Sequence, residues 1–274
     1  MHYAQNRLKK MANIHPSALV DAAAELDSTV TVGPFTTIGP HVRIGAGTKI
    51  GSHCVIEGRT TIGCDNTIFQ FNSLGAVPQD KKYAGEPCEL VIGDRNTIRE
   101  FCTFNIGTAN DKGVTRLGND NWIMAYVHLA HDCQIGHHTI FANSTQLAGH
   151  VSVGDWAILG GFTVVHQYCR IGAHSFTAMN SLLFADLPPF AMCQGQPAKV
   201  RSMNYEGLKR RGYTPEQIKV VKSLHKSIYR NGLTLEDSIT EINQITDDNP
   251  AVQSIVKTMI DFLVSVRPEH GIIR

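Results

Sequence analysis

Four histidines of this chain recur at spacings that would gather them on one edge of a coiled backbone. His131, His150 and His166 follow one another at intervals close to three hexads of a repeat described below, and His128 precedes His131 by half a hexad. Asp132 directly follows His131. Imidazole titrates near neutral pH, so such a group can take up and release a proton during a reaction. We therefore expect His131 to be a general base.

Two other interpretations fit the same histidines. A zinc site would need three or four converging ligands, which residues stacked along one edge of a single chain provide poorly, although a trimer axis could gather them. A structural ladder would instead hydrogen-bond its imidazoles to the corner backbone. We favour acid–base chemistry and expect no metal. Asp132 can assist His131 only at a corner, because adjacent residues on a strand point to opposite faces.

A six-residue repeat is the element that would position these side chains. From Ile14 to Leu183 an aliphatic residue, or occasionally phenylalanine, returns at almost every sixth position of the repeat. Such a period suits a short strand followed by a tight corner, with the aliphatic side chain pointing inward. Three hexads make one coil, so stacked coils would form a parallel β-helix in which equivalent residues of successive coils lie about 5 Å from each other.

Glycine follows the aliphatic residue in many hexads, and we expect it to accept a strained corner backbone. These glycines are Gly39, Gly45, Gly51, Gly63, Gly93, Gly118, Gly136, Gly154 and Gly172.

Two polar excursions interrupt the repeat, at residues 75–91 and between Asn105 and Arg116. A regular solenoid carries its insertions on the outer surface, where function often lies, although decorative loops are the alternative.

Helical signals begin after Pro197, where the hexad period stops. Thr214, Thr234 and Asn249 are each placed to cap a helix, and proline follows the first and the last of them. We therefore divide the chain into an N-terminal extension (1–11), a β-helix (12–198) and a small helical domain (199–274).

The composition argues against several protein classes. A net charge of +1 does not favour broad attraction to nucleic acid. The seven cysteines are scattered, odd in number and without a CxxC pair, which fits the reduced thiols of a cytosol. No stretch is apolar for long enough to span a bilayer, and residues 1–10 lack the apolar run of a signal peptide. These features predict a soluble, cytoplasmic protein.

Besides the hexad repeat itself, five segments of the chain are distinctive: His128–Cys133, Leu147–Ser152, Val165–Gln167, Gln79–Pro87 and Asn204–Gly212. Together with the repeat, they resemble the UDP-N-acetylglucosamine O-acyltransferase family, which begins lipid A biosynthesis. The likeness covers nearly the whole chain from about residue 12. The hexads alone would indicate only the broader superfamily of hexapeptide acyltransferases.

This resemblance implies a left-handed parallel β-helix and a homotrimer with active sites between neighbouring subunits. The implied reaction moves a 3-hydroxyacyl group from acyl carrier protein to the glucosamine 3-hydroxyl of UDP-N-acetylglucosamine, and it needs no cofactor. His131 would be the general base, Asp132 would hold it, and the backbone N–H of Gly149 would stabilise the oxyanion.

The resemblance also implies a set of substrate contacts. These residues are Asp80, Lys82, His128, His150, His166 and Gln167, with Asn204, Glu206, Arg210 and Arg211 at the nucleotide end. Without the family context, the basic run at 209–211 would be interpreted equally well as a solvated patch, and it could also bind the acidic carrier protein.

The chain departs from the family pattern at two places. Asn105–Thr108 stands where most members have His-Arg-Gly-Thr, which could alter the acceptor or weaken turnover. Phe176 and Met179 stand where small residues usually line the acyl groove, and we expect these bulky side chains to shorten or redirect it. Two alternatives follow: a related sugar-nucleotide N-acyl- or acetyltransferase with an amino-sugar acceptor, or a weakly active paralogue that binds nucleotide sugar.

Overall fold

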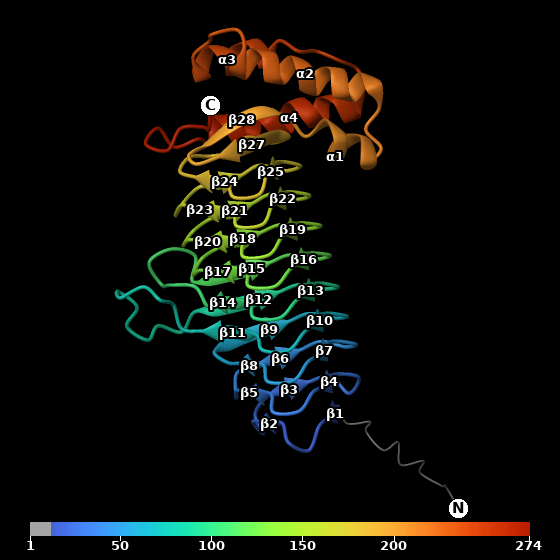
Figure 1. Cartoon of the computed structure of the whole chain (residues 1–274), viewed down its shortest axis with the longest axis vertical. Helices are drawn as coiled ribbons and strands as arrows, with labels where there is room; N and C mark the ends of the chain where they lie inside the picture. Colours follow the sequence, from blue (N-terminus) through green and yellow to red (C-terminus); the bar gives the residue numbers. More distant parts are fainter. Residues whose placement is uncertain (1–11) are drawn as a thin grey trace, which may run out of the picture.

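The computed structural model describes residues 12–274, and the extension predicted for residues 1–11 lies outside this range. Short strands wind into a tall prism with three faces, and helices cover its C-terminal end (Figure 1). From β1 to β26 the strands of one face pair in parallel at intervals of three along the chain, as β17 does with β20. At the C-terminal end β25 pairs in parallel with β27, and β27 pairs antiparallel with β28. The predicted class, a parallel β-helix of hexads followed by a small helical domain, is confirmed.

The three faces are called sheets A, B and C here, in the order in which the chain visits them. Sheet A contains β1 (Asn13–Ile14), β4 (Thr31–Val32), β7 (Lys49–Ile50), β10 (Thr67–Ile68), β13 (Thr97–Ile98), β16 (Trp122–Ile123), β19 (Ile140–Phe141), β22 (Ile158–Leu159), β25 (Phe176–Thr177), β27 (Ala191–Gly195) and β28 (Ala198–Met203). Sheet B contains β2 (Leu19–Val20), β5 (Thr37–Ile38), β8 (Val55–Ile56), β11 (Ser73–Ala76), β14 (Thr103–Asn105), β17 (His128–Leu129), β20 (Gln146–Leu147), β23 (Val164–Val165) and β26 (Leu182–Leu183). Sheet C contains β3 (Glu25–Leu26), β6 (Arg43–Ile44), β9 (Arg59–Ile62), β12 (Glu89–Ile92), β15 (Val114–Leu117), β18 (Gln134–Ile135), β21 (Ser152–Val153) and β24 (Arg170–Ile171).

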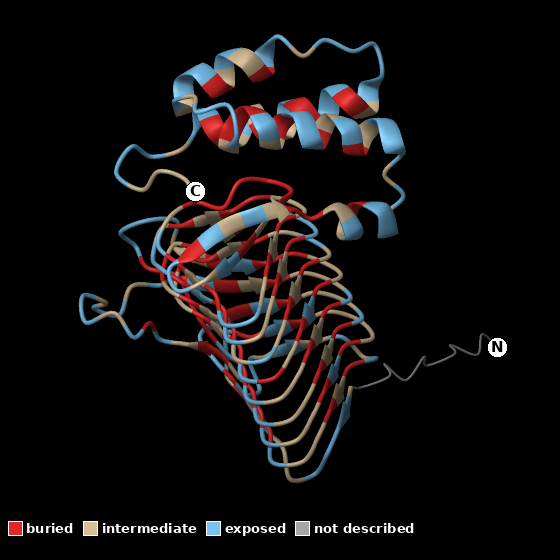
Figure 2. Cartoon of the chain, turned by 45° about the horizontal axis from the view of Figure 1, so that its top comes forward, coloured by how far each residue is buried: buried red, intermediate tan, exposed pale blue. Residues whose placement is uncertain are grey.

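The aliphatic residue of each hexad points into the prism, as its period predicts. Leu129, Leu147 and Val165, which occupy successive coils of sheet B, are fully buried. Buried positions recur from coil to coil in the same way (Figure 2). Burying one such side chain stabilises the fold by roughly 1.5–3 kcal/mol, so the column forms a continuous core.

The predicted role of the hexad glycines is wrong. None of the glycines named for that role has a positive φ, whereas corner residues such as Asp132 (φ 61°) and His150 (φ 64°) do. All of these glycines except Gly39 are needed because the coils stack closely: a Cβ atom on Gly51, for example, would lie 2.6 Å from the amide nitrogen of Gln70. Non-glycine residues therefore accept the left-handed corners, at a cost of about 1–2 kcal/mol each.

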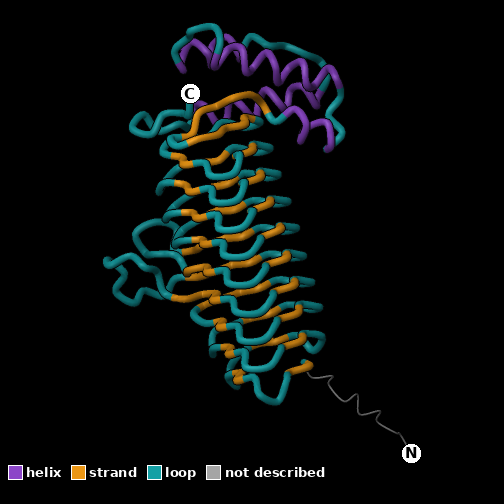
Figure 3. The backbone as a smooth tube through the Cα atoms, viewed as in Figure 1, coloured by secondary structure: helices purple, strands orange, loops and turns teal. Residues whose placement is uncertain are grey.

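Both excursions leave the prism at the corner between sheets B and C and project from the same side of it (Figure 3). Residues 77–88 connect β11 to β12, and residues 106–113 connect β14 to β15. Ser73 still pairs with Thr103, and Thr103 with His128, although more than three hexads of sequence separate the partners. The excursions thus lengthen their two coils while the core positions stay aligned, and the register shifts only after Leu74, where the first excursion leaves β11.

Four helices follow the prism: α1 (Tyr205–Arg210), α2 (Pro215–Tyr229), α3 (Leu235–Asn243) and α4 (Pro250–Val264). Thr214, Thr234 and Asn249 cap α2, α3 and α4, as predicted. Helix α1 was not predicted. The division at residue 198 stays a prediction, since β28 continues to Met203. No described helix is both long and apolar enough to cross a bilayer.

Candidate active site

The histidines of the predicted site share the corner between sheets B and C, where both excursions emerge. His131 lies between β17 and β18, His150 between β20 and β21, and His166 between β23 and β24. His131 is stacked beneath Gly149, and Asp132 beneath His150, because each pair occupies equivalent positions of successive coils. The prediction that these side chains gather along one edge is confirmed.

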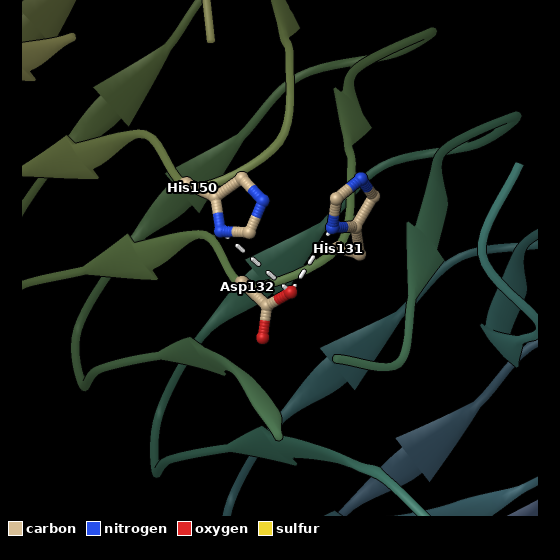
Figure 4. Close-up of side chains that lie close together, drawn as sticks. All are labelled: His131, Asp132 and His150. Carbon is tan, nitrogen blue, oxygen red and sulfur yellow. Dashed lines mark hydrogen bonds and ion pairs between the residues drawn. The ribbon is translucent and has the colours of Figure 1, made fainter. Parts of the chain in front are cut away.

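Asp132 contacts the imidazole of His131 directly. The His131 Nδ1 atom lies 3.0 Å from Asp132 Oδ2 (Figure 4). The two residues can meet because they occupy a corner, in which Asp132 has a φ of 61° in place of an extended strand conformation. The condition set by the sequence for a cooperating pair is therefore met.

Asp132 is fully buried, and threonines satisfy its polar groups. The backbone N–H of Thr108 donates to both carboxylate oxygens at 3.1 Å, and its Oγ1 donates to Oδ2 at 2.6 Å. The backbone N–H of Asp132 donates to Thr115 Oγ1 at 2.8 Å. A buried carboxylate without such donors would be very costly. The second excursion, which supplies Thr108, therefore holds the carboxylate that holds His131.

Gly149 packs against the His131 ring. A Cβ atom at residue 149 would lie 2.6 Å from Cε1 and 2.7 Å from Nε2 of His131. The Gly149 N–H is buried in the same corner and donates to no acceptor among residues 12–274. It is thus available to an oxygen atom brought close to His131.

His150 has a fixed ring with two carboxylates in reach. Its ring stacks on Tyr168 at 4.2 Å, with an interplanar angle of 3°, and meets the His131 ring edge-on at 4.8 Å. The His150 Nδ1 atom lies 2.7 Å from Asp111 Oδ2 and 3.8 Å from Asp132 Oδ2. Neither contact was found from the sequence. Asp111 belongs to an aperiodic excursion, which has no register from which its contacts follow. Tyr168 lies three hexads after His150, so the repeat could have indicated this stack.

This geometry suits proton transfer. Asp132 on Nδ1 favours the tautomer in which Nδ1 carries the proton and Nε2 is free to accept one. His131, Asp132 and His150 each place a potential ligand atom within 4.8 Å of the others. Both Nδ1 atoms, however, already face a carboxylate, which orients each ring as in a general-base pair.

Comparison with known proteins identifies the family of this chain. Residues 186–273 match the family described as UDP-N-acetylglucosamine O-acyltransferase, domain 2, and residues 24–58 and 115–149 match the bacterial transferase hexapeptide repeat. The chain is 67% identical over 264 residues, 96% of its length, to the complete acyl-acyl-carrier-protein–UDP-N-acetylglucosamine O-acyltransferase of Albidiferax ferrireducens. The chain belongs to the UDP-N-acetylglucosamine O-acyltransferase family.

Solved structures of the UDP-N-acetylglucosamine O-acyltransferase family have the same fold. The UDP-N-acetylglucosamine acyltransferase of Francisella novicida is 39% identical and superposes with a TM-score of 0.90, covering 95% of this chain and 94% of that one. The O-acyltransferase of Moraxella catarrhalis is 38% identical, with a TM-score of 0.90 and coverage of 95% and 99%.

His128 faces the same edge from β17. Its Nδ1 lies 2.7 Å from Thr103 Oγ1 on the coil below. Burial lowers the pKa of His128, and the charge that His131 can carry lowers it further. His128 therefore favours its neutral form and can act as a hydrogen-bonding partner.

The remaining predicted contacts of this edge are more exposed. His166 and Gln167 lie at the surface one coil above His150, and His166 Nδ1 lies 3.2 Å from the Gln167 carbonyl oxygen. Asp80 and Lys82 belong to the first excursion, where the Lys82 backbone N–H donates to Asp80 Oδ1 at 3.0 Å.

The predicted nucleotide contacts lie at a different edge of the prism. Arg211 donates from Nη2 to the carbonyl oxygen of Trp156 at 2.8 Å, at the corner between sheets C and A. Asn204 caps α1 and also donates to the carbonyl oxygen of His174 at 3.0 Å. Glu206 and Arg210 are exposed on α1, and Glu206 pairs with Lys209. Within one chain the two groups of predicted contacts are not brought together.

His174 was not predicted, and it has the most strongly shifted histidine pKa. Burial, followed by the positive charge of Arg211, lowers its pKa to about 4. The ring stacks on Phe190 at 5.6 Å and lies 3.2 Å through Nε2 from the hydroxyl of Tyr213. It is a packed, neutral histidine beneath α1.

The residues of the predicted acyl groove lie high on the prism. Phe176 is half-buried on β25, and Met179 is 70% exposed at the corner between sheets A and B. Val164 and Phe184 add exposed apolar surface nearby on sheet B and after β26. An apolar surface of this kind is compatible with an acyl chain.

Asn105 holds the first excursion in place. Its Nδ2 donates to the carbonyl oxygens of Val77 at 3.1 Å and Ala76 at 3.4 Å. Its Oδ1 is buried and has no partner among the described residues. Ile106 is also buried.

Proposed function

We propose that this chain transfers a 3-hydroxyacyl group from acyl carrier protein to the 3-hydroxyl of UDP-N-acetylglucosamine, the first step of lipid A biosynthesis. The observation that carries the proposal is the His131–Asp132 contact of 3.0 Å beneath Gly149. The relatives that bear the corresponding O-acyltransferase name match almost the whole chain.

The chemistry assigned to His131 is general-base catalysis. Its Nε2 takes the proton of the sugar hydroxyl while the hydroxyl oxygen forms a bond to the thioester carbonyl carbon. The negative charge moves to the carbonyl oxygen, which the Gly149 N–H stabilises. The carbon–sulfur bond then breaks, and the leaving thiolate takes the proton back from His131. The thioester is already activated, so positioning, a base and an oxyanion donor suffice.

We also propose that the active protein is a homotrimer whose sites lie between subunits. His131 and Arg211 lie at different corners of one prism, so a nucleotide sugar that touched both would need two subunits. Exposed apolar side chains such as Phe162, Met179 and Phe184 supply surface that a neighbour would cover.

A cytoplasmic location is proposed as well. All seven cysteines are free, and most are buried in the prism. Reduced thiols of this kind are typical of proteins in a reducing compartment.

The direct test is an acyl-transfer assay with UDP-N-acetylglucosamine, its 3-amino analogue and a panel of 3-hydroxyacyl carrier proteins. We expect an O-acylated product and a loss of at least about 100-fold in His131→Ala. Product formed only from the amino sugar would favour the N-acyltransferase alternative. Undiminished product in His131→Ala would exclude His131 as the base.

A further inference from the structure

Asp111 belongs to an anchored excursion. The Gly107 N–H donates to the carbonyl oxygen of Glu89 at 3.1 Å, and the Gly113 N–H to that of Thr108 at 3.0 Å. Thr108 is tied to Asp132 by three hydrogen bonds. The base of residues 106–113 is therefore fixed both to β12, through Glu89, and to the coil that carries His131, through Asp132. Asp111 lies in the remaining part of this excursion.

The side chain of Asp111 turns back to the corner. This side chain is 35% exposed, yet its Oδ2 lies 2.7 Å from Nδ1 of His150, whose side chain is only 11% exposed. The stack on Tyr168 and the edge contact with His131 prevent the His150 ring from turning freely. The Nδ1 atom must therefore point to the side on which Asp111 and Asp132 lie.

Two carboxylates are available to this nitrogen, and Asp111 is the nearer one. Asp132 Oδ2 lies 3.8 Å from His150 Nδ1, and it already receives His131 Nδ1 at 3.0 Å and Thr108 Oγ1 at 2.6 Å. A further charged or polar donor would weaken these bonds by sharing the same oxygen. In the structure each imidazole has its own carboxylate.

We propose that Asp111 is a positioning residue that holds the Nδ1–H of His150 and so reserves Asp132 for His131. This inference deepens the proposed function, on which it rests. With Nδ1 protonated toward Asp111, the His150 Nε2 atom becomes an acceptor for a hydroxyl or amide N–H of the sugar substrate. Without Asp111, Asp132 Oδ2 at 3.8 Å is the carboxylate oxygen left to the Nδ1–H of His150. His150 then competes with His131 for that oxygen, and the His131 ring is held less firmly.

The experiment compares Asp111→Ala and Asp111→Asn with a matched control, Asn110→Ala. Asn110 is the exposed neighbour of Asp111 on the same excursion. The first measurement is nuclear magnetic resonance of the ring nitrogens and Nδ1–H protons in substrate-free, ¹⁵N-histidine-labelled protein. Signals are assigned with His131→Gln and His150→Gln. The second measurement is kcat and KM for acyl transfer.

In Asp111→Ala we expect the His131 ring signals to shift and kcat to fall about tenfold, with little change in KM for the carrier protein. Asp111→Asn can still accept the Nδ1–H through its amide oxygen, so we expect it to stay within about threefold of the natural protein. Asn110→Ala should match the natural protein in both measurements.

The proposal requires both effects. It is overturned if the His131 signals of Asp111→Ala coincide with those of Asn110→Ala, or if the two variants have the same kcat. If the natural protein transfers no acyl group to any acceptor, the proposed function fails. The resonance spectra of the substrate-free protein still decide whether Asp111 holds His150.

Discussion

The ring of His131 lies so close beneath Gly149 that any Cβ atom at residue 149 would come within 2.7 Å of Nε2, the atom assigned the proton transfer. The contact arises because the two residues are three hexads apart and therefore stacked on successive coils. A side chain at residue 149 would push the imidazole away from its reactive position.

Gly149→Ala should therefore lower kcat by about 100-fold, since a displacement of about 1 Å is enough for such a loss. Gly161→Ala is the matched control. Gly161 occupies the same position of its hexad, but its Cβ would lie an ordinary 3.4 Å from the nearest atom, the carbonyl oxygen of Asn143. Thermal unfolding and kcat should be measured for both; equal kcat values would show that the ring tolerates the methyl group.

Thr108→Val should weaken the support of the Asp132 carboxylate, which orients His131. It removes the 2.6 Å hydrogen bond to the buried Asp132 carboxylate while keeping the shape of the side chain. We expect the free energy of unfolding to fall by about 1–3 kcal/mol and kcat to fall about tenfold. Thr61→Val, at an exposed position of sheet C, is the control. Urea unfolding and steady-state kinetics measure the two effects. An unchanged kcat in Thr108→Val would show that this hydrogen bond does not contribute to catalysis.

Met179→Gly should shift the donor preference to longer acyl chains, because it removes a bulky side chain that is 70% exposed at the predicted groove. A competition assay with carrier proteins of different acyl lengths gives the profile. Phe35→Gly serves as control, since Phe35 is also exposed and its φ of 57° suits glycine. If the profile of acyl lengths were identical to that of the natural protein, Met179 would not limit the length of the acyl chain.

His174 should make the free energy of unfolding depend on pH. Its pKa in the folded chain is about 4, below the ordinary value of 6.5, mainly because of burial. As the pH falls below about 6.5, the unfolded chain gains a proton that the folded chain does not, so stability is lost progressively down to about pH 4. The shift corresponds to a loss of roughly 3 kcal/mol at most.

Urea unfolding of the natural protein and His174→Gln between pH 7.5 and 4 tests this expectation. The difference in unfolding free energy between them should shrink as the pH falls. His137→Gln changes an exposed histidine two coils before His174 and controls for general effects of removing an imidazole. A difference independent of pH would show that His174 keeps its ordinary titration after folding.

The hexad predicted the prism because the inward position of residues such as Leu147 depends only on local periodicity. The His131–Asp132 pair could be predicted conditionally, since only its place in the coil had to be a corner. The glycine role was misjudged because it depends on the backbone of the next coil, as Gly51 and Gln70 illustrate. The distance between a glycine and the backbone of the next coil cannot be read from the local sequence.

Thr108 and Asp111 could not be predicted, because an aperiodic excursion has no register from which its contacts follow. Helix α1 was missed for a related reason. It is short and contains Gly207, and it depends on Asn204, which caps it and reaches the distant His174 carbonyl. Tertiary contacts decide both features.

Both excursions leave and rejoin the prism at a single corner, so the residues they add do not disturb the phase of the coils. A single deletion between His131 and His150 would, by contrast, rotate every later side chain out of alignment. Length variation among homologues should therefore concentrate in the two excursions, at the corner between sheets B and C that carries His131. Selectivity can evolve there while the scaffold stays the same.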